Sequence, residues 1–420
     1  CTPFNNSNGL RRLIIMANLN AWQKLTRVLP GQPFGNGSDG AGTILVDTNW
    51  GTIVNYVNCS GVSGGTALTA GSTTNVSNGD VVLIHQTIGV GAGQWEINKV
   101  ASGGVSGTVI MTKPLQYDYV SNSQFLKIKQ YSSLTLAGTG GISPRNNDRD
   151  LLSIGGITPI ACNGLGTFAG TINLSGATGG TSAPNPGYGA WTPGRGHRGG
   201  LGASLAPTFT GWTAGGYAGG ESQSRNANGN GGGGGYITGG GQSAGGAGGG
   251  NGAVGTKGVD GGGGLSGTAG GTASSSNLTI FNLGGGGAGA VCIQTGEVGD
   301  GGSGAGGLML FCKNIAFTGT LQGFGGNGGA TAGGHGGGGG AGASVLLVCK
   351  TGTIGDQIIR CNGGVGCNGS GADGGNGGVG VIAVHHSGLF VGTTQPSYND
   401  INDPSLVEGG AVFNLTSKSW

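Results

Sequence analysis

The sequence predicts an all-β protein, in which a small β domain precedes a parallel β-solenoid with glycine-rich, polyglycine-II-like helical excursions. Three observations support this fold class. Glycine accounts for 107 of the 420 residues, whereas charged residues make up only 8 %. Short apolar segments beginning at residues 308, 345 and 381 alternate with long glycine tracts. Every third residue from Gly246 to Gly270 is a glycine.

The composition excludes several classes of protein. So much glycine is typical of collagen or of low-complexity chains, but the phased stretch contains no proline and 35 % of all residues are hydrophobic, which argues against both collagen and disorder. The net charge of +2 gives no reason to expect nucleic acid as a partner. No apolar run approaches the roughly 18 residues of a spanning helix, so membrane insertion is not expected either.

The first part, residues 1–43, is predicted to be a lead-in. Arg11 and Arg12 can be encoded by a ribosome-binding sequence, and Met16 follows at the usual distance of a start codon. Residues 1–15 are therefore interpreted as translated upstream sequence, and a genuine N-terminus at Cys1 is the alternative.

Residues 44–137 are predicted to form the small all-β domain. The segments 79–87, 93–100, 107–112 and 125–136 are short, rich in β-branched or alternating residues, and bounded by Gly, Ser and Asn. Such segments are typical of strands joined by tight turns.

Residues 138–390 are predicted to form the solenoid. The segments "LMLFCK" (308–313), "VLLVCK" (345–350) and "VIAVHH" (381–386) recur at spacings of 37 and 36 residues, each after a glycine-rich tract. "TFAGTINLSGATGG" (167–180) shares its Phe-x-Gly-Thr step with residues 317–320. A fixed period indicates repeated units that bury their faces on one another. Residues 391–420 are then a C-terminal cap or a partner-binding arm, whose "AVFNL" could add a strand to another subunit.

The glycine tracts at 211–250, 246–270, 323–342 and 363–380 are predicted to form helices of the polyproline-II type. Such a helix has three residues per turn and no internal hydrogen bonds, so it is stable only against neighbours. Glycine at every third position would allow the backbones to approach closely. The alternative is that these tracts are irregular loops on the solenoid surface.

Several segments resemble known proteins. "FGNGSDGAGT", "GDVVLIHQT", "WEINKV", "QYSSLTL" and the repeated tract-and-strand units resemble glycine-rich extracellular and phage surface proteins with β-solenoid strands. The tracts over about 200–380 are similar in composition to the glycine-rich tip adhesins of T-even-like phage tail fibres, although these lack a regular strand repeat. Both resemblances imply an extracellular or virion-borne protein without catalytic activity.

The few acidic residues give little support for an enzyme, and no cofactor is expected. A glycosidase needs two facing carboxylates, and the closest pair is Asp148 and Asp150 in "NNDRD", a context more typical of a turn. A glycan-degrading solenoid is therefore kept only as a lesser alternative.

The strand alignment also raises the question of a metal. It places Cys312, Cys349 and His385 at one position, and Lys313, Lys350 and His386 at the next. Equivalent residues of parallel strands lie about 4.7–4.9 Å apart, so this column is a weak candidate for zinc. A column of small buried side chains is the more ordinary interpretation, and no metal is predicted.

One region combines aromatic and cationic side chains that suit a sugar or an anionic ligand. It comprises "NPGYGAWTPGRGHRGG" (185–200) and the neighbouring tracts, with Tyr188, Trp191, Arg195, His197, Arg198, Trp212, Tyr217 and Tyr236 as candidate binding residues. The rings either form an exposed binding tip or plug the base of the bundle.

Two functions are expected from these features. The first is an adhesin or receptor-binding protein at a cell or virion surface, whose partner is a surface glycan or protein. The second is a subunit that assembles with itself into an extracellular filament, sheath or virion. Both place the protein outside the cell or on a virion.

Overall fold

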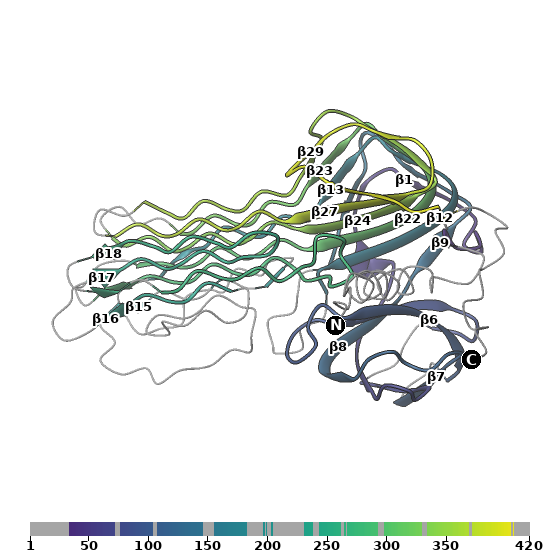
Figure 1. Ribbon diagram of the computed structural model, residues 1–420, viewed down its shortest axis with the longest axis horizontal. Helices are drawn as coiled ribbons and strands as arrows, with labels where there is room; N and C mark the ends of the chain where they lie inside the picture. Colours follow the sequence, from purple (N-terminus) through teal and green to yellow (C-terminus); the bar gives the residue numbers. More distant parts are fainter. Residues whose placement is uncertain are drawn as a thin grey trace, which may run out of the picture.

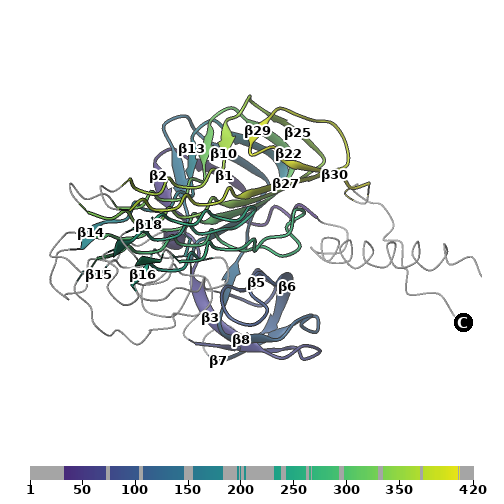
Figure 2. The same ribbon diagram turned by 60° about the vertical axis from the view of Figure 1, so that its left-hand side comes forward.

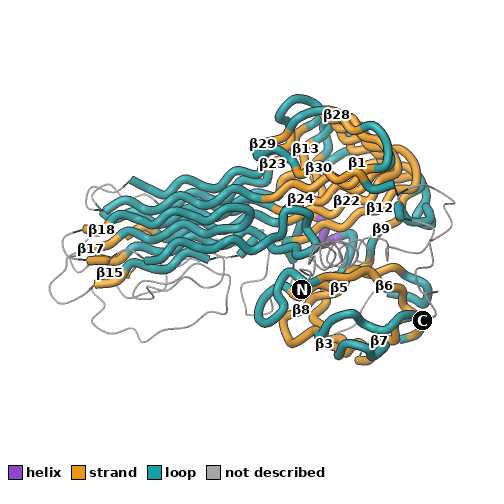
Figure 3. The backbone as a smooth tube through the Cα atoms, in the orientation of Figure 1, coloured by secondary structure: helices purple, strands orange, loops and turns teal. Residues whose placement is uncertain are grey.

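The computed structural model describes residues 33–71, 76–103, 107–145, 155–182, 196–197, 199, 203–204, 231–237, 243–261, 264–265, 267–292, 298–329, 334–368, 372–404 and 406. Within these residues the chain forms thirty strands and one short helix, η1 (Trp50–Thr52). The prediction of an all-β protein is confirmed. Figure 3 shows that the longer strands gather at one end of the molecule, while loop segments make up the other end.

Two parallel sheets form the centre of the fold (Figure 1). The larger sheet contains β1 (Ala41–Ile44), β10 (Ser133–Leu136), β12 (Ile157–Phe168), β22 (Gly307–Phe317), β24 (Ser344–Cys349), β27 (Val381–His386) and β30 (Asn399–Asn402), with β9 (Lys129–Tyr131), β25 (Thr351–Ile354) and β28 (Phe390–Val391) beside them. The smaller sheet contains β2 (Asp47–Asn49), β11 (Gly141–Ser143), β13 (Thr171–Asn173), β23 (Thr320–Gln322), β26 (Ile359–Arg360) and β29 (Thr394–Gln395). Neighbouring strands follow the order of the chain in both sheets, and the chain alternates between them. Each passage therefore adds a strand to both sheets.

The core between these sheets consists of columns of apolar side chains at equivalent positions of successive strands. The register places Ile44, Leu136, Phe168, Phe317 and Ile354 in one column. The rings of Phe168 and Phe317 stack with centroids 5.2 Å apart. The smaller sheet contributes a buried column of its own: Ile142, Ile172, Leu321 and Ile359. The strands that the sequence repeat identified are buried along almost their whole length, which explains why their sequences are continuously apolar.

A closed antiparallel barrel lies between β2 and β9 in the sequence. It contains β3 (Tyr56–Gly61), β4 (Ala67–Ala70), β7 (Gly107–Met111), β6 (Trp95–Ser102), β5 (Val81–Gln86) and β8 (Tyr119–Lys127), in that order around the barrel. These strands lie within the range 44–137 expected for a small β domain. Strands β2 and β10, which lie in the same range, pair with the parallel sheets instead. The barrel is thus an insertion into the parallel sheets.

The barrel packs firmly against the rest of the fold because β5 is buried on both faces. Val82 and Ile84 belong to the barrel interior, while Val81 and Leu83 join the apolar core that continues into the parallel sheets. Hydrogen bonds reinforce this contact. Trp95 Nε1 donates to the carbonyl oxygen of Leu278 at 3.0 Å.

The glycine-rich segments extend from the sheets as a bundle of neighbouring, extended chains (Figures 1 and 2). We call the segments 174–180, 245–259, 283–290, 298–306, 323–329, 334–343, 361–368 and 372–380 the glycine bundle. Four two-residue strands adjoin these segments, namely β14 (Thr181–Ser182), β17 (Ser243–Ala244), β18 (Asp260–Gly261) and β20 (Val291–Cys292), and β21 (Val298–Gly299) begins segment 298–306. The strands β15 (Ala203–Ser204), β16 (Tyr236–Ile237) and β19 (Gly264–Leu265) lie outside the segments. Figure 1 shows β15 to β18 at the end remote from the sheets. Apart from β21 and the isolated bridges at His335 and Ala372, the segments are neither helix nor strand, so polyglycine-II-like helices remain a prediction.

Candidate functional site

The glycine bundle is held together by hydrogen bonds that recur every third residue. Segment 334–343 shows the pattern, because its backbone donors point in turn to three different neighbours. Gly336, Gly339 and Gly342 donate to Ala372, Gly375 and Gly378; Gly338 and Ala341 donate to Ala288 and Gly285; Gly340 and Ala343 donate to Gly326 and Gly323. A segment without internal hydrogen bonds is thereby bonded on three sides.

Glycine is required at these contacts because the backbones touch directly. A methyl group on Gly302 would overlap with the carbonyl oxygen of Gly326, and one on Gly338 would overlap with that of Ala247. Both obstacles are backbone atoms, which cannot rotate away as a side chain would. The glycine phase that the sequence shows is thus a packing requirement of the bundle.

On the outer face of the bundle, side-chain oxygens accept hydrogen bonds from backbone N–H groups, as the carbonyls of neighbouring segments do inside it. Asn327 Oδ1 accepts from the backbone N–H of Val365 at 2.9 Å, and Asn376 Oδ1 accepts from that of Gly366 at 2.8 Å. The hydroxyl of Thr256 accepts from the N–H of Asn376 at 2.6 Å. The exposed valines of the bundle are Val254, Val259, Val365 and Val379. The described part of this surface therefore combines polar side chains with exposed valines, and it carries the ion pair of Lys257 with Asp260.

A buried polar network joins the bundle to the large sheet. The amide of Asn251 donates to the carbonyl of Gly342 at 2.9 Å and to the Ser344 hydroxyl at 3.1 Å. The Ser274 hydroxyl donates to Asn251 Oδ1 at 2.7 Å, and the Ser344 hydroxyl donates to the carbonyl of Asn282 at 2.5 Å. Asn251 and Ser344 are completely buried. Because breaking a buried network leaves polar atoms unsatisfied, this network fixes the root of the bundle.

Of the predicted binding residues, His197 is the one whose side chain the structure describes, and it is buried. Its backbone N–H donates to Gly284 at 3.0 Å and its carbonyl accepts from Gly304 at 2.7 Å. Burial, and to a lesser extent the neighbouring His85, lowers the pKa of the imidazole to about 3. A ring in this position offers no surface to a sugar.

The other predicted rings and cations are not placed at a common site. The backbone of Tyr236 lies opposite Leu265 in the pairing of β16 with β19. The remaining candidates lie outside the described residues: Tyr188, Trp191, Arg195, Arg198, Trp212 and Tyr217. Their role as a binding tip or as a plug stays a prediction. The carboxylate pair Asp148 and Asp150 also lies outside the described residues.

The alignment that placed Cys312, Cys349 and His385 at one position of the strands is wrong by one residue at His385. The register pairs Val348 with His385 and Cys349 with His386, because the spacing of 37 residues is kept between β24 and β27. His385 therefore points away from the thiols, and its Nε2 lies 3.2 Å from the carbonyl oxygen of Asn277. His386 instead contacts Asp400, with Nε2 and Oδ1 2.7 Å apart.

The sequence alignment also missed a member of the column, because Cys162 pairs with Cys312. The Phe-x-Gly-Thr step shared by residues 168 and 317 would have placed Asn163 opposite Cys312, because the register shifts by one residue between Cys162 and Leu165. Burial raises the pKa of Cys312, while the hydrogen bond from its thiol lowers the pKa of Cys162 to about 7. Within the described residues, no three His, Cys, Asp or Glu side chains gather closely enough for a metal ion.

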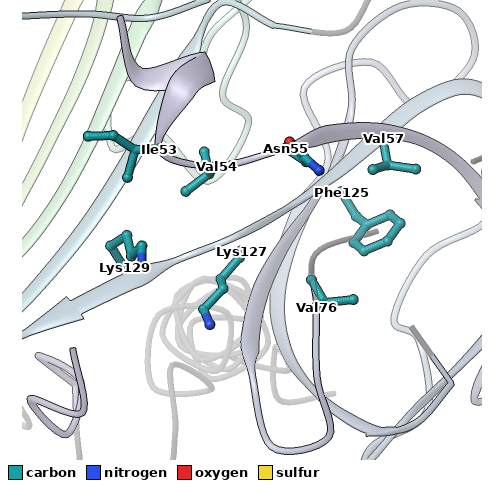
Figure 4. A pocket seen from close by; sticks show the side chains of 8 residues that line it. All are labelled: Ile53, Val54, Asn55, Val57, Val76, Phe125, Lys127 and Lys129. Carbon is teal, nitrogen blue, oxygen red and sulfur yellow. The ribbon is translucent and has the colours of Figure 1, made fainter. Parts of the chain in front are cut away.

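A hollow of about 140 Å³ lies where the barrel meets the parallel sheets (Figure 4). It is lined by Ile53, Val54, Asn55, Val57, Val76, Phe125, Lys127 and Lys129. Lys127 forms an ion pair with Asp80 at 2.8 Å, and Lys129 forms one with Asp39 at 3.0 Å. Both cations of the lining are therefore compensated by carboxylates, so the hollow gives no indication of an anion site.

Comparison with known proteins gives no relative. No protein-family model matches the chain, and no curated protein sequence matches it significantly. The described residues contain no helix that is long and apolar enough to cross a membrane.

Proposed function

We propose that this protein is a non-enzymatic surface protein of the adhesin or receptor-binding type, displayed outside a cell or on a virion. The observation that carries the proposal is the hydrogen-bond pattern of the glycine bundle. Hydrogen bonds to neighbours on three sides make the bundle a stiff projection from the sheets. Binding residues are often found on loops that a rigid scaffold positions. A projection whose short strands β15 to β18 lie remote from the sheets suits the display of such loops.

The proposal includes polyglycine-II helices in the bundle. A helix with three residues per turn presents each third residue to the same side, and the donors of segment 334–343 reach the same neighbour at intervals of three residues. It also includes a solenoid base, in which each passage through both sheets is one coil. Far-UV circular dichroism should then show β and polyproline-II signals together. A helical content above about one fifth, still below that of an ordinary globular protein, would contradict this architecture.

The adhesin is tested by binding to surfaces. Fluorescently labelled protein would be applied to a glycan array and to a panel of bacterial cells. The double variant Trp191→Ala, Arg195→Ala removes a predicted aromatic and cationic pair, and Thr135→Ala on the large sheet is the control. We expect wild type and control to bind the same targets and the double variant to bind more weakly. Equal binding by all three proteins would remove these residues from the site, and no binding to any target would refute the adhesin.

A second candidate, the self-assembling subunit, is favoured by the sheet edges. Among the described strands, β1 and β30 pair on one side only and run in the same direction. The last strand of one copy could thus continue on the first strand of another. However, β30 carries the exposed Asp400, and Pro396 follows β29 directly. Charge and proline are devices that block edges, which weakens this candidate. Electron micrographs of purified protein distinguish the two, because filaments would support the subunit and separate particles the adhesin.

The state of the cysteines bears on localisation. Cys59, Cys162, Cys312, Cys349 and Cys361 are buried free thiols. Secreted proteins usually oxidise their cysteines, whereas proteins that fold in the cytosol keep them reduced. This favours a protein that folds in the cytosol and is carried on a virion. Thiol counting on native material should then find these five thiols reduced.

A further inference from the structure

Both ring nitrogens of His386 face oxygen atoms at the end of the larger sheet. Nε2 lies 2.7 Å from Oδ1 of Asp400, and Nδ1 lies 2.5 Å from the carbonyl oxygen of Gly388. His386 ends β27, and Asp400 belongs to β30, which among the described strands pairs with β27 only. The imidazole thus joins the last strand of the sheet to the turn that follows β27.

These contacts require a proton at each ring nitrogen. Carbonyl and carboxylate oxygens only accept hydrogen bonds, and a neutral imidazole has a single N–H to donate. With a neutral ring beside an ionised carboxylate, one of the two contacts would bring lone pair against lone pair. The arrangement therefore holds one proton more than a neutral histidine beside a carboxylate.

The surroundings of the ring favour its charged form. Phe390 stacks on the imidazole of His386, with centroids 6.0 Å apart and planes inclined by 28°, and the face of an aromatic ring attracts a cation. The His386 side chain is only 13 % exposed, whereas that of Asp400 is 61 % exposed. Water therefore has little access to the ring nitrogens, and a contact that is lost there is not readily replaced.

The other titratable groups near the ring leave its proton in place. Asp403 follows β30, and its backbone N–H donates to the carbonyl of His386 at 2.6 Å. Burial lowers the pKa of His385, so this neighbour stays neutral and does not compete for the proton. Burial and Asp400 raise the pKa of Tyr398, which packs on Phe390. On the other side, Lys350 follows β24 and is exposed to solvent.

We propose that His386 and Asp400 form a proton-dependent latch that holds the terminal strand β30 on β27. In the closed latch, the doubly protonated imidazole donates to Asp400 and to the carbonyl of Gly388. As the pH rises, the ring gives one proton to solvent, keeps one of these hydrogen bonds and loses the other. A free histidine makes this change between pH 5 and 8, so the latch is closed at pH 5 and weakened at pH 8. Opening moves the unpaired edge of the sheet from β30 to β27.

Hydrogen exchange of residues 399–403 in the full-length protein at pH 5, 6, 7 and 8 measures this opening. Each rate is divided by that of an unstructured peptide of the same sequence at the same pH, which removes the intrinsic pH dependence of exchange. Asp400→Asn is the decisive variant, because its amide can donate to a neutral Nε2 and the contact then needs no extra proton. His385→Gln is the control, since it removes the neighbouring histidine, whose Nε2 contacts the carbonyl of Asn277 instead.

We expect the protection of residues 399–403 in wild type and His385→Gln to fall about tenfold from pH 5 to pH 8, because a difference of one proton allows at most tenfold per pH unit. In Asp400→Asn the fall should be less than twofold. Nitrogen NMR of wild type at pH 5 should show both nitrogens protonated in the ring whose signals shift in Asp400→Asn. Constant protection in wild type, an equal fall in Asp400→Asn, or a neutral His386 ring at pH 5 would each overturn the latch. Loss of the pH dependence in His385→Gln would assign it to that residue and overturn the latch as well.

Discussion

The backbone of Gly255 lies directly on the carbonyl oxygen of Gly248, so closely that a methyl group on Gly255 would overlap with that oxygen. Gly255 belongs to the phased stretch 246–270 and is buried, while the adjacent Val254 is 56 % exposed. Contact and outward positions are thus adjacent at this point of the segment, although Gly245 and Gly248, which lie off the triplet phase, also touch neighbouring backbone.

The first prediction follows from this contrast. Gly255→Val places a β-branched side chain against fixed backbone, and we expect a loss of about 1–3 kcal/mol in the free energy of unfolding, as for other overpacked sites. Val254→Ser changes an exposed position and should cost less than about 0.5 kcal/mol. Hydrogen exchange of segment 245–259 is the measurement. Unprotected exchange of this segment in wild type would show that it is an irregular loop.

The second prediction concerns the outer face of the bundle. Asn376→Ala removes the acceptor of the Gly366 N–H, and we expect a loss of about 1 kcal/mol together with faster exchange at Gly366. Asn368→Ala is the control, because Asn368 is also an exposed asparagine of the bundle. Thermal unfolding of both variants measures the difference. If the two variants unfold at the same temperature, the side-chain bond contributes nothing to stability.

The third prediction is a pH dependence that arises from buried histidines. Burial lowers the pKa of His85 from 6.5 to about 4, although the hydrogen bond to Phe281 opposes the shift. Between these two values the unfolded chain binds more protons than the folded protein, so the free energy of unfolding falls as the pH falls from 6.5 towards 4. Above pH 6.5 the contribution is fully present. The slope approaches about 1.4 kcal/mol per pH unit for such a histidine.

Urea unfolding at pH 7, 6 and 5 measures this slope. His85→Gln cannot take up the proton, so its stability should depend less on pH than that of wild type, even though the variant is less stable at pH 7. Other titrating groups contribute equally to both proteins. Parallel curves for the two proteins would contradict the assignment.

The fourth prediction tests the stacked core of the sheets. Phe317 is buried and stacks on Phe168, so Phe317→Ala should cost about 3–5 kcal/mol through lost contacts and a cavity. Val391→Ala removes a side chain that is 40 % exposed on the same sheet, and it should cost far less. Chemical denaturation of both variants gives the comparison. A similar loss for the two would mean that the columns do not form the core.

The close backbone contacts of the glycine bundle were predictable in part, because the spacing of glycines in the sequence indicates where they occur. A position where a Cβ would clash with neighbouring backbone must be occupied by glycine. The regular spacing of glycines from Gly246 to Gly270 therefore indicates such close contacts from the sequence alone. The sequence does not show which segments touch. Gly336 donates to Ala372 and Gly338 to Ala288, but glycine presents the same surface to every neighbour, so only the three-dimensional arrangement selects the partner.

The sequence by itself determined the all-β class and the repeated strands, because both follow from local composition and period. The tertiary structure decided the closure of the barrel, its insertion between β2 and β9, and the register that pairs Cys349 with His386. The strand "VLLVC" is buried on both faces, and its partner β27 is buried from Val381 to His385, so neither strand shows an alternation of buried and exposed residues. Alternation therefore could not fix this register, and the stacking of whole strands on their neighbours did.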